Sequence, residues 1–69
     1  MEPTTIELWQ HENGSLYAVE IDNDGRIVRA SDSLGDDDTI KLAMNGDFDN
    51  AHDLEWFTFY SHQFARLNW

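Results

Sequence analysis

Two dipeptides, Asn13-Gly14 and Asp24-Gly25, constrain the fold of this chain more than any other feature. Such pairs readily supply the two positive φ angles of a two-residue type I′ hairpin turn. Alternating apolar and polar residues flank both dipeptides, as expected of half-buried strands. The first half of the sequence therefore predicts a three-stranded antiparallel meander built from two hairpins.

A two-residue loop at each turn also sets the predicted register of the strands. The first hairpin then pairs Leu8 with Val19, and the second pairs Val19 with Ala30. Because both turns put apolar side chains on one side, the sheet should have a single core face. The residues expected on that face are Ile6, Leu8, Tyr17, Val19, Ile21, Val28 and Ala30.

The other face of the predicted sheet is acidic. The same register places Glu7 directly opposite Glu20, and Glu20 opposite Arg29. Like charges directly opposite each other destabilise a sheet, so this face should be open to water. Trp9 is expected on it, as an exposed aromatic available to a partner.

The middle segment, residues 36–45, favours a short helix. It has acids in its first turn and Gly46 just past its end, which suits the helix dipole and a C-terminal cap. Residues 39–44 also alternate well enough to form a fourth strand, and periodicity cannot decide for so short a run. Both alternatives stay open, with the helix preferred.

The last segment predicts one long amphipathic helix that starts with Asn50 as its N-cap. Its apolar positions fall within one arc of a helical wheel, and Phe59 falls outside that arc. The positions on the arc are Trp56, Phe57, Tyr60, Phe64 and Leu67. We therefore expect an α+β fold with this aromatic-rich helix across one sheet face. With 69 residues the chain has room for one core, so residues 1–69 should form a single domain.

Charge is the main sequence signal for function. Fourteen Asp and Glu against four Lys and Arg give a formal net charge of -10, which disfavours direct binding to nucleic acid. Eight of the acids lie between Asp32 and Glu55, where Lys41 is the only base. The charge is therefore concentrated in the middle of the sequence.

Composition and termini indicate where such a chain should work. It has no cysteine, so disulfides and thiolate metal sites are excluded and a reducing cytosol is the expected location. Residues 1–5 contain neither basic residues nor an apolar run, unlike a signal peptide. No stretch approaches membrane-spanning length, so we expect a cytoplasmic protein without a membrane partner.

Signals for catalysis or cofactors are weak. Residues 20–27 resemble the start of an EF-hand calcium loop, but Ser31 stands where the closing bidentate Glu is required. The three histidines are too scattered for a zinc site, and the chain contains no nucleophile motif or Gly-rich phosphate loop. We expect no metal, no cofactor and no enzymatic activity.

Alternating acids suggest a different role. Glu20, Asp22 and Asp24 would project from one strand face at intervals of about 6.6 Å, close to the spacing of phosphates along a nucleic acid. Such an array suits a basic groove of another protein, so the expected partner is a basic protein, bound by a monomer or homodimer. The predicted acidic contact residues are Glu7, Glu20, Asp22, Asp24, Asp36, Asp37, Asp38, Asp47 and Asp49, and the aromatic ones are Trp9 and Phe59.

In size, acidity and the combination of hairpins with one helix, the chain resembles phage-encoded inhibitors that mimic nucleic acid, among them anti-CRISPR, anti-restriction and uracil-DNA glycosylase inhibitor proteins. This likeness covers charge and size alone. It implies a non-enzymatic inhibitor or regulator that occupies a nucleic-acid-binding groove. The alternative is a structural or accessory interaction module, such as a subunit or a homodimer, that buries Trp9, Phe59 or Trp69 against an apolar partner, with acidity serving solubility.

Overall fold

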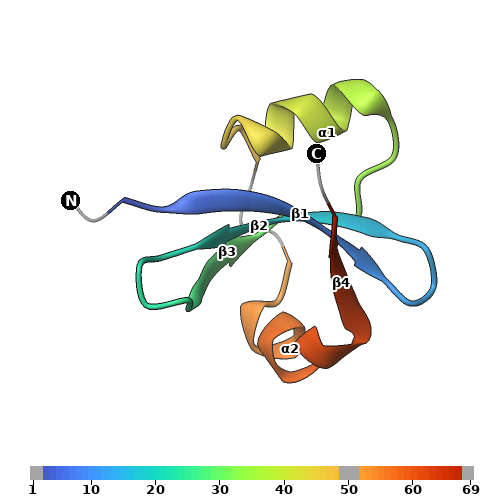
Figure 1. The fold of residues 1–69 in the computed structure, drawn as a ribbon. Coiled ribbons are helices and arrows are strands. Elements are labelled where there is room, and N and C mark those ends of the chain that lie inside the picture. The colour runs from blue at the N-terminus through green and yellow to red at the C-terminus, as the bar shows by residue number, and fades with distance from the viewer. Residues whose placement is uncertain (1–2, 49–51, 68–69) are drawn as a thin grey trace.

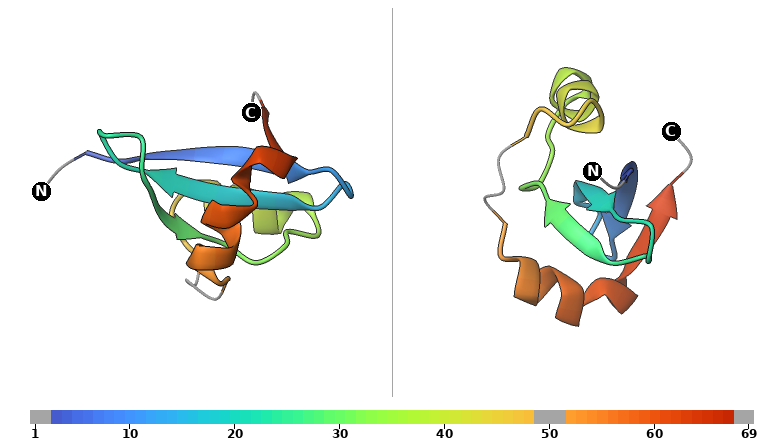
Figure 2. Two further views of the ribbon diagram at one scale, coloured as in Figure 1. Left: turned by 90° about the horizontal axis from the view of Figure 1, so that it is seen from below. Right: turned by 90° about the vertical axis from the view of Figure 1, so that its left-hand side faces the viewer.

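The computed structural model describes residues 3–48 and 52–67. It shows an α+β fold in which an antiparallel four-stranded sheet lies between two helices, one on each face (Figure 1 and Figure 2). The strand order across the sheet is β3-β2-β1-β4. The elements are β1 (Thr5–His11), β2 (Leu16–Ile21), β3 (Ile27–Ala30), α1 (Asp37–Met44), α2 (Leu54–Phe59), the 3-10 turn η1 (Ser61–Gln63) and β4 (Phe64–Leu67).

The predicted meander of β1, β2 and β3 is confirmed, but its first turn differs from the prediction. Gly14 has a φ of 98°, whereas none of the described non-glycine residues has a positive φ, so Asn13 does not adopt the type I′ conformation. The loop has three residues instead of two. It is closed by hydrogen bonds from the His11 N–H to the Ser15 carbonyl and from the Gly14 N–H to the His11 carbonyl, both at 2.8 Å.

The extra loop residue shifts the pairing of β1 with β2 by one position. Leu8 pairs with Ala18 rather than with Val19. Because side chains alternate along a strand, a shift of one residue exchanges the faces of β1 relative to β2. Trp9 therefore shares a face with Val19, and Leu8 lies on the opposite one. The prediction that Ile6 and Leu8 share one core face with Val19 is wrong.

In the second hairpin, a β-bulge restores the predicted register after the first pair of residues. This hairpin also closes through a three-residue loop, residues 23–25, so Ile21 pairs with Ile27 rather than with Val28. A β-bulge at this point leaves Val28 as the extra residue and restores the predicted pairing from Glu20 onward. The two confirmed pairs are Glu20 with Arg29 and Val19 with Ala30.

The C-terminal segment forms a shorter helix than predicted, followed by a fourth strand. Helix α2 begins at Leu54, with Asp53 as its N-cap; the carboxylate of Asp53 accepts a hydrogen bond from the Trp56 N–H at 3.1 Å. Asn50, the predicted cap, lies outside the described residues. The helix ends at Phe59, and β4 pairs antiparallel with β1. The predictions of three strands and of one helix running to Leu67 are wrong.

Phe57 of α2 is the centre of the core on one sheet face. Its side chain is fully buried, and its ring centroid lies 4.3 Å from that of Phe64 and 5.8 Å from that of Trp9. Rings at such separations add specific contacts to the apolar area they bury. The buried cluster on this face comprises Trp9, Tyr17, Val19, Ile21, Ala30 and Phe57.

Helix α1 covers the opposite face of the sheet. The preferred helix for this segment is confirmed, and the strand alternative is wrong. Ile40 and Ala43 lie one turn apart and are the buried residues of α1, which contacts β1 and β2. Leu8 and Ala18 are buried on this side of the sheet. The sheet is therefore covered on both faces, and neither is the open acidic surface expected from the sequence.

Candidate functional site

Glu7 does not face Glu20 in the structure, and its charge is compensated. On the α2 side of the sheet, Oε2 of Glu7 lies 3.0 Å from Nε of Arg66 on β4 and accepts a hydrogen bond of 3.1 Å from Nε1 of Trp9. The Arg66 guanidinium also lies 5.4 Å from the centre of the Trp9 ring. Glu7 thus belongs to a local network that joins β1 to β4.

Glu20 lies on the opposite sheet face and is compensated as well. Its Oε1 is 3.3 Å from Nε of Arg29, the predicted neighbour on β3, and its Oε2 accepts a hydrogen bond of 2.9 Å from Oγ1 of Thr4. The predicted opposition of the two glutamates is wrong, because the register shift moves Glu7 to the other face. Two of the four basic residues of the chain are used in these two ion pairs.

Asp22 and Asp24 lie in the loop beyond the end of β2. One carboxylate oxygen of Asp22, Oδ1, accepts hydrogen bonds of 2.9 Å from the N–H groups of Asp24 and Arg26. This is the local bonding by which Asp stabilises a turn. The predicted straight array of Glu20, Asp22 and Asp24 along one strand is therefore not formed. Within residues 3–48 and 52–67, no group of three or more His, Asp or Glu is placed to hold a metal ion.

Asp36, Asp37 and Asp38 lie together at the start of α1, all of them exposed. Asp36 is the N-cap, and its Oδ1 accepts hydrogen bonds of 2.8 Å from both the backbone N–H and the hydroxyl of Thr39. These bonds favour the ionised form, so they hold the pKa of Asp36 below its ordinary value of 3.8. Asp37 and Asp38 occupy the first turn, where the helix dipole also favours negative charge.

The pKa of Asp36 predicts a change of stability in acid. Because the pKa is lower in the folded chain, the contribution of this carboxylate is complete above about pH 4 and is lost as the pH falls through the lowered value. Asp36→Asn keeps a capping oxygen but does not titrate. We expect wild type to have a slightly higher Tm than Asp36→Asn at neutral pH and to lose this advantage as the pH falls below 3.8 and through the lowered pKa. Thermal melts across this range measure it, and an advantage that persists in strong acid contradicts it.

Four exposed carboxylates border α1, and we call them the acidic α1 surface: Asp36, Asp37, Asp38 and Asp47. Among the described residues, the ion pairs made by Arg side chains go to Glu7 and Glu20, and neither involves this surface. Asp49, also predicted as a contact, lies outside the described residues. Lys41 is exposed on α1 itself. Among the residues that the structure describes, this surface is the largest group of predicted contact acids outside the Arg ion pairs.

The two predicted aromatic contacts have opposite outcomes. Trp9 is only 8% exposed, so the prediction that it lies on a wet sheet face is wrong. Phe59 is 72% exposed, as expected of its position off the helix arc. Trp69, the third aromatic of the alternative, lies outside the described residues. With Leu54, Glu55 and Thr58, Phe59 lines a shallow hollow on the outer side of α2, and most of the hollow's surface is apolar.

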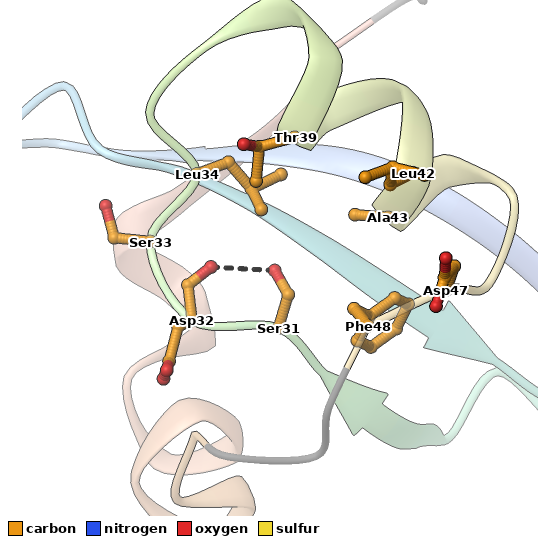
Figure 3. Close-up of a pocket in the computed structure, with 9 residues that line it drawn as sticks. All are labelled: Ser31, Asp32, Ser33, Leu34, Thr39, Leu42, Ala43, Asp47 and Phe48. Atoms are coloured by element: carbon orange, nitrogen blue, oxygen red, sulfur yellow. Dashed lines mark hydrogen bonds between the residues drawn. The ribbon is translucent and has the colours of Figure 1, made fainter.

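A pocket of about 280 Å³ opens beside α1 (Figure 3). It lies between the helix, the connector that follows β3 and the residues that follow the helix. No motif or periodicity in the sequence predicted this pocket, because its walls come from three short segments that meet only in the folded chain. The residues that line it are Ser31, Asp32, Ser33, Leu34, Thr39, Leu42, Ala43, Asp47 and Phe48.

Comparison with known proteins gives no match to a protein-family model, a curated protein or a solved structure. In the part of the chain that the structure describes, no helix is both long enough and apolar enough to cross a membrane. The features of the fold that offer a binding surface are the acidic α1 surface, the pocket beside it and the exposed Phe59.

Proposed function

We propose that this protein is a non-enzymatic inhibitor or regulator that binds a basic partner protein through the acidic α1 surface. The observation that supports this is the distribution of compensated charge. Glu7 and Glu20 have Arg partners on the two sheet faces, whereas the four acids around α1 are exposed and, among the described residues, outside these ion pairs. We place this activity in a reducing cytosol, because the chain has no cysteine.

The partner proposed is a nucleic-acid-binding protein, because such proteins carry basic surfaces that bind phosphates. A carboxylate surface competes for the same lysines and arginines and gains from the same release of counterions. Occupation of the groove would exclude nucleic acid, which is the action of counter-defence inhibitors of the anti-CRISPR or anti-restriction type. The acidic α1 surface differs from the array of acids that the sequence predicted, because it is centred on α1 rather than on β2.

The test is an affinity capture from bacterial lysate with the tagged protein, washed stepwise from low to high salt. We expect nucleic-acid-binding proteins to be retained at low salt, because attraction between exposed charges is screened as salt rises. They should be released both by salt and by added DNA or RNA. The purified partner should then lose its nucleic-acid binding when this protein is added. A partner that stays bound in high salt and ignores nucleic acid contradicts the proposal.

A second candidate function is supported by the exposure of Phe59. This side chain and its apolar hollow suit an accessory module that docks on an apolar partner or forms a homodimer through α2. Binding of that kind would be insensitive to salt. The same stepwise wash separates the two candidates, and Phe59→Ser would weaken the second without affecting the first.

A further inference from the structure

We propose that the pocket beside α1 receives one lysine or arginine side chain of the partner protein. This inference rests on the proposed function, because it names the contact by which the basic partner is recognised. It commits to a basic side chain, rather than to a small-molecule cofactor or an apolar anchor.

The size of the pocket favours a single side chain. Small-molecule and cofactor sites usually occupy roughly 300–1,000 Å³, whereas this pocket has about 280 Å³. Its volume is still many times the ~10–15 Å³ that one buried water requires. The volume therefore lies at the small end of such sites, which suits a single long side chain, and it is large enough for more than ordered water.

The walls of the pocket suit an aliphatic stem. Figure 3 shows Leu34, Leu42 and Ala43 on one side and Phe48 across from them. Lysine and arginine bury such stems along apolar surface while their charged ends reach a polar edge. The four residues therefore provide a surface along which the stem of a basic side chain can lie.

The polar edge of the pocket is acidic. Asp47 lies at the end next to Leu42 and Phe48, and Thr39, one turn into α1 from the Asp36 cap, lies toward the other end (Figure 3). The carboxylate of Asp32 turns away from the pocket and is 4.0 Å from Nδ1 of His52. Asp47 is thus the carboxylate to which we assign the charged end of the incoming side chain.

Nearby hydroxyl and cationic groups do not oppose this assignment. The hydroxyl of Ser31 donates to the Asp32 carbonyl and accepts from the Ala18 N–H, so it is already satisfied. The Arg29 guanidinium lies 4.5 Å from the centre of the Phe48 ring, but its Nε is 3.3 Å from the Glu20 carboxylate, which compensates its charge. An uncharged occupant would bring apolar atoms against Asp47 without pairing it, which is unfavourable.

The test uses ¹⁵N-labelled protein titrated with Nα-acetyl-lysine amide, followed by backbone amide shifts. We expect saturable shifts with a Kd in the millimolar range, confined to the pocket amides of Leu34, Leu42, Asp47 and Phe48. The matched control is Nα-acetyl-norleucine amide, which has the same carbon chain without the ammonium group. It should produce much smaller shifts. Equal shifts from both compounds, or none from lysine amide, would overturn the proposal.

Two variants test whether Asp47 is the carboxylate that binds the charged end of the lysine side chain. Asp47→Asn should weaken the lysine-induced shifts several-fold, whereas Asp24→Asn, which removes an exposed acid in the β2–β3 loop, should leave them unchanged. Equal effects of both variants would overturn the assignment to Asp47. If lysine amide fails to bind while capture by salt-sensitive partners succeeds, only the pocket assignment is lost. If lysine amide binds and no basic partner is captured, the proposed function fails instead.

Discussion

Phe57→Ala is expected to destabilise the protein by about 3–5 kcal/mol, the usual cost of removing a buried Phe side chain together with the cavity it leaves. Phe57 is fully buried, and its ring contacts Phe64, Trp9 and Tyr17. At roughly 0.05–0.15 kcal/mol per residue, a chain of this length has about 3–10 kcal/mol of stability in total. The variant should therefore lose a large fraction of its total stability, and at the lower end of that range it would be largely unfolded at room temperature.

Urea unfolding followed by tryptophan fluorescence measures this loss, since Trp9 lies in the same cluster. Phe59→Ala is the matched control, because it removes the same side chain two positions further along α2 at a site that is 72% exposed. Its effect should stay within about 0.5 kcal/mol. If the two variants lose similar amounts of stability, Phe57 is not the centre of the core.

The sequence predicted the positions of the two turns correctly, but it did not predict the lengths of their loops. Asn13-Gly14 and Asp24-Gly25 correctly marked both hairpins, since each glycine supplies a positive φ. They did not determine the loop length, because the same dipeptides fit a three-residue loop in which glycine alone is left-handed. The one-residue difference reversed the faces of β1 and placed Trp9 in the core.

The missed strand has another physical cause. Residues 64–67 lie in a run whose apolar positions fit a helix, and the aromatic residues before them support that pattern. The helix stops at Phe59, and pairing with the free edge of β1 stabilises the last residues as a strand. Such tertiary pairing overrides local propensity and is not visible in a short window.

The sequence predicted which acids are close together along the chain, but it did not predict which of them form ion pairs in the fold. The sequence showed where acids are dense, and Asp36, Asp37 and Asp38 do lie together at the start of α1. It did not show that Glu7 pairs with Arg66, because that contact requires the unforeseen β4. Counting charges therefore overstated the acidity of the sheet and did not reveal the pocket.

Changing the charge at the start of α1 should strongly weaken binding to a basic partner. The variant Asp36→Asn/Asp37→Lys/Asp38→Lys keeps a capping oxygen at position 36, because loss of the Asp36 cap would disturb α1 itself. One neutralisation and two reversals raise the net charge by five units. Like charges placed against each other at an interface cost several kcal/mol. Since each 1.4 kcal/mol is tenfold in affinity, we expect about a hundredfold weaker binding at low salt.

The measurement is the affinity for the captured partner at several salt concentrations, with circular dichroism to show that the helices are retained. The matched control, Glu12→Lys/Asp24→Lys/Glu55→Gln, changes the net charge by the same amount at exposed positions away from α1. If binding depends on the acidic α1 surface, the control should lose much less affinity than the α1 variant. Equal losses would mean that the partner responds to overall charge, and the α1 surface would then have no special role.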